Sequence, residues 1–243
     1  MNYDKYNREE RAICAHLFRL LHERLDQKNS SPLGQLLSKL GLTDLRYKNI
    51  GIFCEVSIIR DAFQDCKPTV IPFMDTLTQI IMKQENVSDC RLYSQLPEVL
   101  NNPKQTHPRQ IRQKASTEGI QLTESESAVY GALQGMFNAK PDLVITVDNK
   151  LLVFEAKLTE SFDEIQLNRT KNITQVWSTM LYKDLGFATQ PEYQIIKLGA
   201  KKFEPQINWS DILLIAQRTY SQGDRTLTVM ESGVELLKQY GLE

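Results

Sequence analysis

Three residues in the middle of the chain, Asp142, Glu155 and Lys157, have the types and spacing that phosphodiester hydrolysis requires. Residues two apart on a strand share a face, so Glu155 and Lys157 are expected to project to the same side of one strand. A divalent metal held by the two carboxylates would polarise a phosphoryl oxygen and lower the pKa of a bound water. The lysine would orient that water or stabilise charge developing in the transition state. The backbone carbonyl of Ala156 is a further candidate ligand.

The predicted hairpin brings the two acids together. Strands are expected over 142–147 and 151–158, joined by a two-residue Asp-Asn loop that tolerates the positive φ of a type I′ turn. Counting outward from this loop, Asp142 lies opposite Glu155. Directly opposed Cβ atoms are roughly 4.5–5.5 Å apart, so the carboxylates repel each other unless a cation lies between them. Hard oxygen ligands favour Mg²⁺, and Mn²⁺ is expected to substitute for it.

A solvated surface hairpin, with its charges in a cross-strand ion pair, is the alternative interpretation. Val144, Leu151 and Val153 are predicted on the same face as the two acids. These apolar side chains need cover, and this disfavours an exposed hairpin.

The pattern Pro141-Asp142, then twelve residues, then Glu155-Ala156-Lys157 resembles the PD-(D/E)xK signature of restriction endonucleases and many repair and defence nucleases. The resemblance covers the hairpin and the helix after it, and the remainder only by the order of elements. It implies an α/β (α+β) fold with a restriction-endonuclease-like αβββαβ core, a central mixed sheet flanked by helices. It also implies a Mg²⁺-dependent DNA endonuclease of restriction, antiphage defence or repair, with Asp142 and Glu155 as metal ligands and Lys157 as the catalytic cation.

Such families often add an acidic residue from the first core helix, and Glu10 is the first candidate here. A helix is predicted over 8–25, with Glu10 near the middle of its apolar face and pointing inward. Glu126 and Glu55 are alternatives. A capping box at the start of a helix is a sufficient explanation for Glu126, and an exposed strand edge explains Glu55.

Some members of the family also use a glutamine on the helix after the lysine. With a helix predicted over 172–185, Gln175 stands in that place, and an exposed helix glutamine explains it equally well.

The most basic stretch, 101–116, has no periodicity and is predicted to be a loop. Arg109, Arg112 and Lys114 are its candidate nucleic-acid contacts, because phosphate binding needs local positive charge. A solvated loop is the alternative.

One domain is expected over 1–243, in which 50–59 forms the first strand of the sheet and 60–139 is a largely helical insertion. The other predicted elements are a helix from about 124 to 137, a strand over 193–198, and C-terminal helices over 209–217 and 227–240.

Composition is that of an ordinary globular protein. The 29 Lys+Arg and 30 Asp+Glu give a net charge of -1, so any basic surface must be local. Four cysteines without a C-x-x-C pair indicate free thiols rather than a zinc site. No apolar leader and no run of about 18 apolar residues is present, which predicts a cytoplasmic protein without a membrane segment.

DNA is the expected partner, and a homodimer or a partner defence protein is left open. Two other functions stay under consideration. One is a catalytically silent nucleic-acid-binding or assembly module with the same fold. The other is an effector nuclease activated by a partner or a small ligand through residues 60–139.

Overall fold

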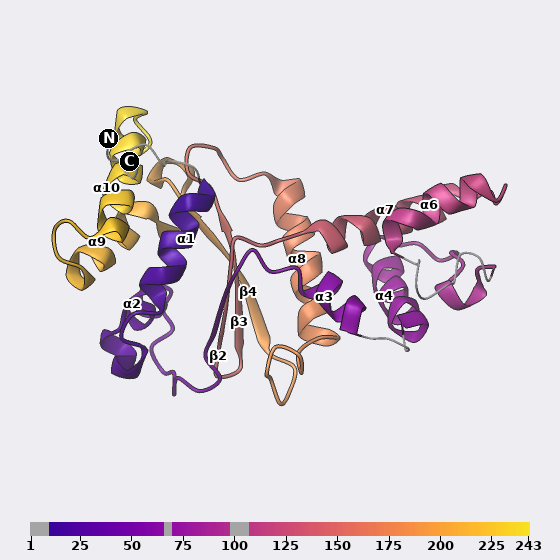
Figure 1. Cartoon of the computed structure of the whole chain (residues 1–243), viewed down its shortest axis with the longest axis horizontal. Helices are drawn as coiled ribbons and strands as arrows, with labels where there is room; N and C mark the ends of the chain where they lie inside the picture. The colour runs from indigo at the N-terminus through magenta and orange to yellow at the C-terminus, as the bar shows by residue number, and fades with distance from the viewer. Residues whose placement is uncertain (1–9, 66–69, 98–106) are drawn as a thin grey trace. The chain divides into compact units, whose positions relative to one another are not determined.

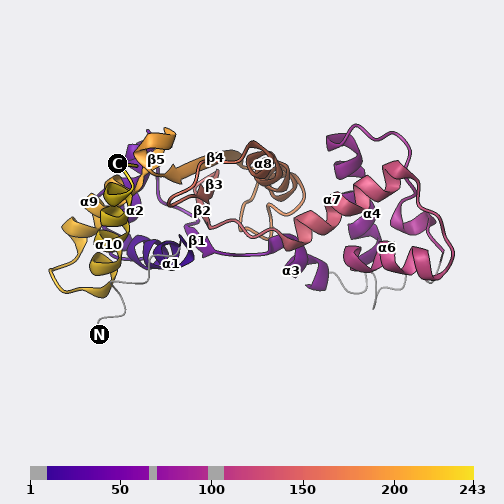
Figure 2. The ribbon, with the colours of Figure 1, turned by 90° about the horizontal axis from the view of Figure 1, so that it is seen from above.

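The computed structural model describes residues 10–65, 70–97 and 107–243. Its contacts divide the chain into two compact units (Figures 1 and 2). Unit 1 comprises Met1–Val56, Pro141–Thr174 and Leu185–Glu243, and unit 2 comprises Ser57–Lys140 and Gln175–Asp184. Among the described residues, no helix is both long enough and apolar enough to span a membrane.

Unit 1 is built on a five-stranded mixed sheet with the order β1-β2-β3-β4-β5. The pairs β1–β2 and β2–β3 are antiparallel, whereas the pairs β3–β4 and β4–β5 are parallel. The strands are β1 (Gly51–Cys54), β2 (Leu143–Val147), β3 (Lys150–Ala156), β4 (Glu192–Gly199) and β5 (Ile207–Asn208).

Both faces of this sheet are covered. One face carries Leu143, Ile145 and Phe154, which pack in one core with the helices α1 (Glu10–Leu21), α2 (Pro32–Lys39), α9 (Trp209–Thr219) and α10 (Arg225–Gln239). The opposite face carries Val144, Val153 and Glu155. The first part of α8 (Glu164–Thr179) covers it, on the side away from α1 (Figures 1 and 2). The predicted α/β fold with a mixed sheet flanked by helices is therefore confirmed.

The register of the β2–β3 hairpin is the predicted one. Val147 pairs with Lys150, and the ladder continues to the other end of β2. Asp142 immediately precedes β2, next to the Leu143–Phe154 pair, and a continuation of the ladder by one residue would bring it opposite Glu155.

The two-residue loop of this hairpin differs from a type I′ turn. Such a turn needs a positive φ at both central residues, but only Asp148 has one, at 51°. The Asp148 carboxylate accepts hydrogen bonds from the backbone N–H groups of Arg46 (2.6 Å) and Lys48 (2.7 Å). These contacts hold the loop and leave the strand register unchanged.

The first strand is shorter than predicted. Instead of 50–59, β1 ends at Cys54, because Glu55 adopts a left-handed φ of 50°. The last two residues of the predicted strand, Ile58 and Ile59, belong instead to the helix α3 (Ile58–Asp65).

The helix after the hairpin begins earlier than predicted. It was expected over 172–185, but α8 runs Glu164–Thr179. The Asp163 carboxylate accepts a hydrogen bond from the backbone N–H of Ile165 (2.9 Å), as a helix-capping side chain does. This earlier start brings two turns of helix onto the sheet face that carries Glu155.

Unit 2 is helical, and residues 60–139, predicted as a largely helical insertion, lie within it. Besides α3, its elements are α4 (Val70–Gln84), the 3-10 turn η3 (Tyr93–Gln95), α6 (Pro108–Thr117) and α7 (Glu124–Asn138).

The basic stretch predicted to be a loop is helical from Pro108 onward, which corrects that prediction. The His107 ring caps α6 by accepting a hydrogen bond from the backbone N–H of Arg109 (3.2 Å). Ile111 and Ala115, four residues apart, are buried on one side of the helix. The apolar spacing was present in the sequence but was sparse among polar residues. Residues 98–106, including the start of this stretch, lie outside the described residues.

The capping box of α7 includes an ion pair between a buried glutamate and a partly exposed arginine, and this pair gives a testable prediction. Glu126 is 3% exposed, and its carboxylate accepts from Arg91 Nε (2.6 Å) and from the backbone N–H of Thr123 (2.8 Å). These hydrogen bonds, with that from Arg91 the strongest, lower the pKa of Glu126 to about 2. Replacing Glu126 with alanine should lower the free energy of unfolding by about 1–3 kcal/mol, because it removes the acceptor of the Thr123 N–H and the carboxylate partner of Arg91.

The pH dependence of this effect has a definite sign. Because folding lowers the pKa of Glu126, its stabilisation is present above about pH 4.5 and is lost as the pH falls towards 2. Chemical denaturation of wild type and Glu126→Ala between pH 2 and 7 should therefore converge at the acid end. Glu124→Ala, an exposed residue of the same first turn, is the control and should change stability by less than about 1 kcal/mol. A constant difference across this range would contradict the prediction.

Candidate active site

The predicted lysine lies between two of the candidate carboxylates. Lys157 Nζ is 3.5 Å from Glu155 Oε1 and 3.8 Å from Glu10 Oε1, and its side chain is 13% exposed. Its backbone is held on both sides: the N–H donates to Leu198 O (2.9 Å), and the carbonyl accepts from Trp209 Nε1 (2.9 Å). The ammonium is therefore positioned by a sheet ladder and a buried indole.

Glu155 is a buried carboxylate held in place by α8. It is 4% exposed, and its oxygens accept hydrogen bonds from the Gln166 side-chain amide and from Thr170 Oγ1 (3.1 Å). Burial, together with repulsion from Asp142, raises the pKa of Glu155 to about 6. Neither contact was predicted, because the helix was expected to begin after both residues. The signal was Asp163, a residue type that favours the start of a helix, three residues before Gln166.

Asp142 turns back across the hairpin. Its Oδ2 accepts a hydrogen bond from the backbone N–H of Ala156 (2.7 Å), while Oδ1 has no protein partner among the described residues. Burial raises the pKa of Asp142 above its usual value, and the nearby Glu55 carboxylate adds to this. The charges of Lys157 and Arg11 offset this rise only in part.

Glu10 reaches the same cluster from the other side of the sheet. Its Oε2 accepts a hydrogen bond from the backbone N–H of Leu158 (3.1 Å). Glu10 is the first described residue of α1, and it lies three, four and seven residues before the buried Ile13, Cys14 and Leu17, on the apolar face where it was predicted. Burial raises the pKa of Glu10, and repulsion from Asp142 contributes. An acidic residue suits the first turn of a helix, where the helix dipole favours negative charge.

One ammonium group faces three carboxylates in this cluster. Burial alone would lower the pKa of Lys157, but Glu10, Glu155 and Asp142 outweigh burial and raise it. Burial is the main cause of the raised pKa of each acid, and the charge of Lys157 offsets this rise only in part. The cluster is an environment that would be stabilised by an added cation.

Each of the remaining candidate acids has a partner other than Lys157, although Glu55 is close enough to Asp142 to raise its pKa. Glu55 forms an ion pair with Arg11 (3.3 Å), and both side chains are substantially exposed. Glu126 belongs to the α7 cap of unit 2, as its capping-box pattern predicted.

The glutamine predicted for the site is also placed elsewhere. Gln175 belongs to unit 2, and its side-chain oxygen accepts from Gln84 Nε2 (3.2 Å). Gln166, nine residues earlier on the same helix, contacts Glu155 in its place. The sequence did not suggest Gln166, because the helix was predicted to begin only at residue 172.

The candidate nucleic-acid contacts lie on one helix of unit 2. Arg109 and Arg112 are exposed on α6, and Lys114 is half-buried on it. The helix holds these side chains at regular spacings from one another, which the predicted loop would not do.

The cysteines are free thiols where the structure describes them. Cys14 and Cys90 are buried and Cys54 is half-buried, whereas Cys66 lies outside the described residues. Burial raises the pKa of all three described thiols.

The donor set fits Mg²⁺ better than a metal that needs a complete protein cage. Over the ranges that the structure describes, no group of three or more His, Cys, Asp or Glu side chains could hold a metal ion by itself. Mg²⁺ is usually bound through one or two carboxylates, with waters and substrate phosphates as its other ligands. Among the described residues Asp142 Oδ1 has no hydrogen-bond partner, and Glu155 Oε2 has a lone pair beyond its hydrogen bond to Thr170. Glu155 Oε1 is shared between Gln166 and Lys157.

Comparison with protein-family models, with curated proteins and with solved structures finds no match to this chain. The functional argument therefore depends on the geometry of the cluster itself.

Proposed function

We propose that the chain is a Mg²⁺-dependent nuclease that hydrolyses phosphodiester bonds in DNA. The observation that carries the proposal is the position of Lys157 Nζ, 3.5 Å from the buried Glu155, with Asp142 close enough to Glu155 to raise its pKa. The element order of unit 1, with a helix, three antiparallel strands, a helix and a parallel strand, supports the resemblance to PD-(D/E)xK nucleases.

Each residue of the cluster has a role in this proposal. Asp142 and Glu155 supply carboxylate oxygens to Mg²⁺, with the Ala156 carbonyl as a further ligand. When bound, the ion would polarise the scissile phosphate and favour ionisation of the attacking water. Lys157 orients that water or stabilises negative charge on the phosphoryl oxygens in the transition state. Glu10 holds Lys157 from the side opposite Glu155.

The basic helix of unit 2 is proposed as a contact with the phosphate backbone. Positive charge for this contact would come from Arg109, Arg112 and Lys114. The affinity for DNA should then fall as salt is added.

Plasmid and oligonucleotide cleavage tests the proposal. Purified wild-type protein should cleave DNA with Mg²⁺ or Mn²⁺ and lose this activity in EDTA. Glu155→Gln should cleave at least about 100-fold more slowly, because it removes a metal ligand. Glu192→Gln, which changes an exposed glutamate of the same sheet, is the matched control and should retain full activity. Cleavage that persists in EDTA, or a wild type inert on single- and double-stranded DNA, would contradict the proposal.

Gln166 is predicted to position Glu155 rather than to contact substrate. Gln166→Ala should lower Mg²⁺ affinity about 10–100-fold, the usual cost of losing a residue that holds a metal ligand. Calorimetric Mg²⁺ titration measures this directly. Gln175→Ala, on the same helix but bonded to Gln84, should leave the affinity unchanged. Equal losses in the two variants would show that the contact with Glu155 is not what matters.

A further inference from the structure

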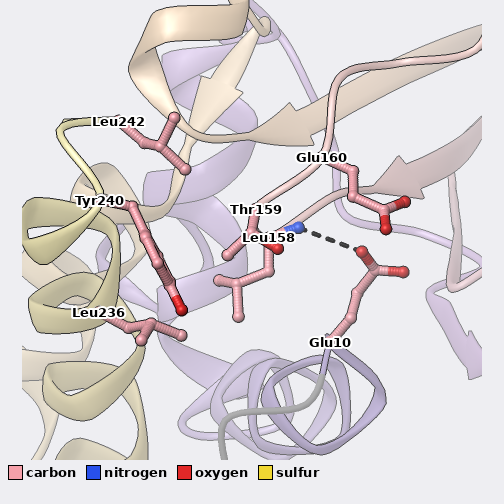
Figure 3. Close-up of a pocket in the computed structure, with 7 residues that line it drawn as sticks. All are labelled: Glu10, Leu158, Thr159, Glu160, Leu236, Tyr240 and Leu242. Carbon is pink, nitrogen blue, oxygen red and sulfur yellow. Dashed lines mark hydrogen bonds between the residues drawn. The ribbon is translucent and has the colours of Figure 1, made fainter.

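A pocket of about 760 Å³ lies beside the catalytic cluster, in unit 1 (Figure 3). It is formed by the start of α1, the segment that follows β3, and the C-terminal end of α10. Glu10 lines it and also contacts Lys157, so the pocket and the cluster share one side chain. Its volume is in the range of small-molecule sites.

The two sides of the pocket differ in chemistry. Figure 3 shows the carboxylates of Glu10 and Glu160 facing each other on one side, with Tyr240, Leu236 and Leu242 on the other. The Glu160 carboxylate is exposed and has no protein partner among the described residues. Tyr240 is 64% exposed, so its ring is available for stacking.

These two sides favour a flat apolar ring with hydrogen-bond donors along one edge. A nucleobase fits this description, because bases stack on aromatic side chains and are read along their Watson–Crick edges when unpaired. Guanine alone among the common bases offers two adjacent donors, N1–H and N2–H, which match the two oxygens of a carboxylate. Adenine and cytosine offer one amino group beside an acceptor nitrogen that a carboxylate repels.

The contact between Glu10 and Lys157 connects this pocket to the proposed scissile phosphate. Since Glu10 contributes both to the pocket wall and to the contact with Lys157, the pocket adjoins the site proposed for the phosphate. A paired guanine already uses its Watson–Crick edge, so the base must come from a single strand, an end or an opened pair.

We infer that this pocket binds an unpaired guanine base, stacked on Tyr240 and hydrogen-bonded to Glu160, next to the phosphate that is cleaved. That this base belongs to a nucleic-acid substrate depends on the proposed nuclease function. An arginine side chain offers a similar pair of donors, but a guanidinium group is small for a pocket of about 760 Å³ and would leave much of its apolar side uncovered. The base therefore fits better.

Binding of nucleosides tests the inference without requiring cleavage. Guanosine, adenosine, cytidine and arginine amide are titrated into wild-type protein by calorimetry, without metal. Guanosine should bind at least about 10-fold more tightly than the other three, the size expected for a paired hydrogen bond to a base edge. Tyr240→Ala and Glu160→Gln should each weaken guanosine binding about 10-fold. Tyr240→Phe, which keeps the stacking ring, should bind as wild type does.

Equal affinity for all nucleosides, or tighter binding of arginine amide, would overturn the inference, as would unchanged guanosine binding in Tyr240→Ala and Glu160→Gln. Cleavage of single-stranded oligonucleotides that contain one guanine separates this result from the proposed function. Metal-dependent cleavage without guanosine preference overturns the pocket assignment alone. Selective guanosine binding by a protein that cleaves no nucleic acid supports the pocket and overturns the nuclease.

Discussion

Replacing Lys157 with alanine should lower kcat for Mg²⁺-dependent DNA cleavage by roughly 10²–10³-fold, the usual loss when one group that stabilises transition-state charge is removed. The reason is the position of its ammonium group, 3.5 Å from Glu155 and 3.8 Å from Glu10. Because both carboxylate ligands remain, Mg²⁺ should still bind. Single-turnover kinetics at saturating Mg²⁺ measure the chemical step separately from metal affinity.

Lys150→Ala is the matched control for this experiment. Lys150 is at the opposite end of the same strand and pairs with the exposed Glu192 (2.5 Å). Its loss should leave kcat within about twofold, because an exposed ion pair contributes little. A Lys157→Ala protein that binds Mg²⁺ and cleaves at the wild-type rate would remove the lysine from the mechanism.

Replacing Asp142 with asparagine should have opposite effects on stability with and without metal. The folded state disfavours the ionised Asp142, because burial and neighbouring acids raise its pKa. A neutral side chain should therefore stabilise the metal-free protein at pH 7, by roughly 0.2–1 kcal/mol for a pair of opposed like charges. Asparagine can still accept the hydrogen bond from Ala156 N. The same substitution removes a proposed carboxylate ligand of Mg²⁺.

Thermal unfolding with and without Mg²⁺ shows both effects. The wild type should gain about 2.7 kcal/mol at a hundredfold excess of Mg²⁺ over Kd, whereas Asp142→Asn should gain almost nothing. Asp61→Asn, an exposed aspartate of α3, should behave as wild type in both conditions. An equal Mg²⁺ response in Asp142→Asn would place the ion elsewhere.

The central sheet could be predicted because its signals are local. A two-residue loop between two apolar strands fixes the pairing of the hairpin, and the alternation of side chains then fixes the face of each acid. For this reason the predicted opposition of Asp142 and Glu155 agrees with the register of β2 and β3.

The surroundings of the site could not be predicted in the same way. The start of α8 depends on one capping residue, Asp163, so the sequence suggested Gln175 where the structure places Gln166. No local pattern indicates that the ring N–H of Trp209 holds the Lys157 backbone, because the two residues are far apart in the sequence. The pocket joins the segment after β3 to residues about 80 positions later, a long-range contact with no local pattern.

An anomalous difference map from crystals grown with Mn²⁺ tests most directly whether Asp142 and Glu155 share one cation. We predict a single strong peak between these two carboxylates, with Lys157 Nζ beside it and Gln166 still bonded to Glu155. No peak at this position, with Asp142 and Glu155 bonded only to Ala156 N and to α8, would contradict the metal site and with it the proposed chemistry.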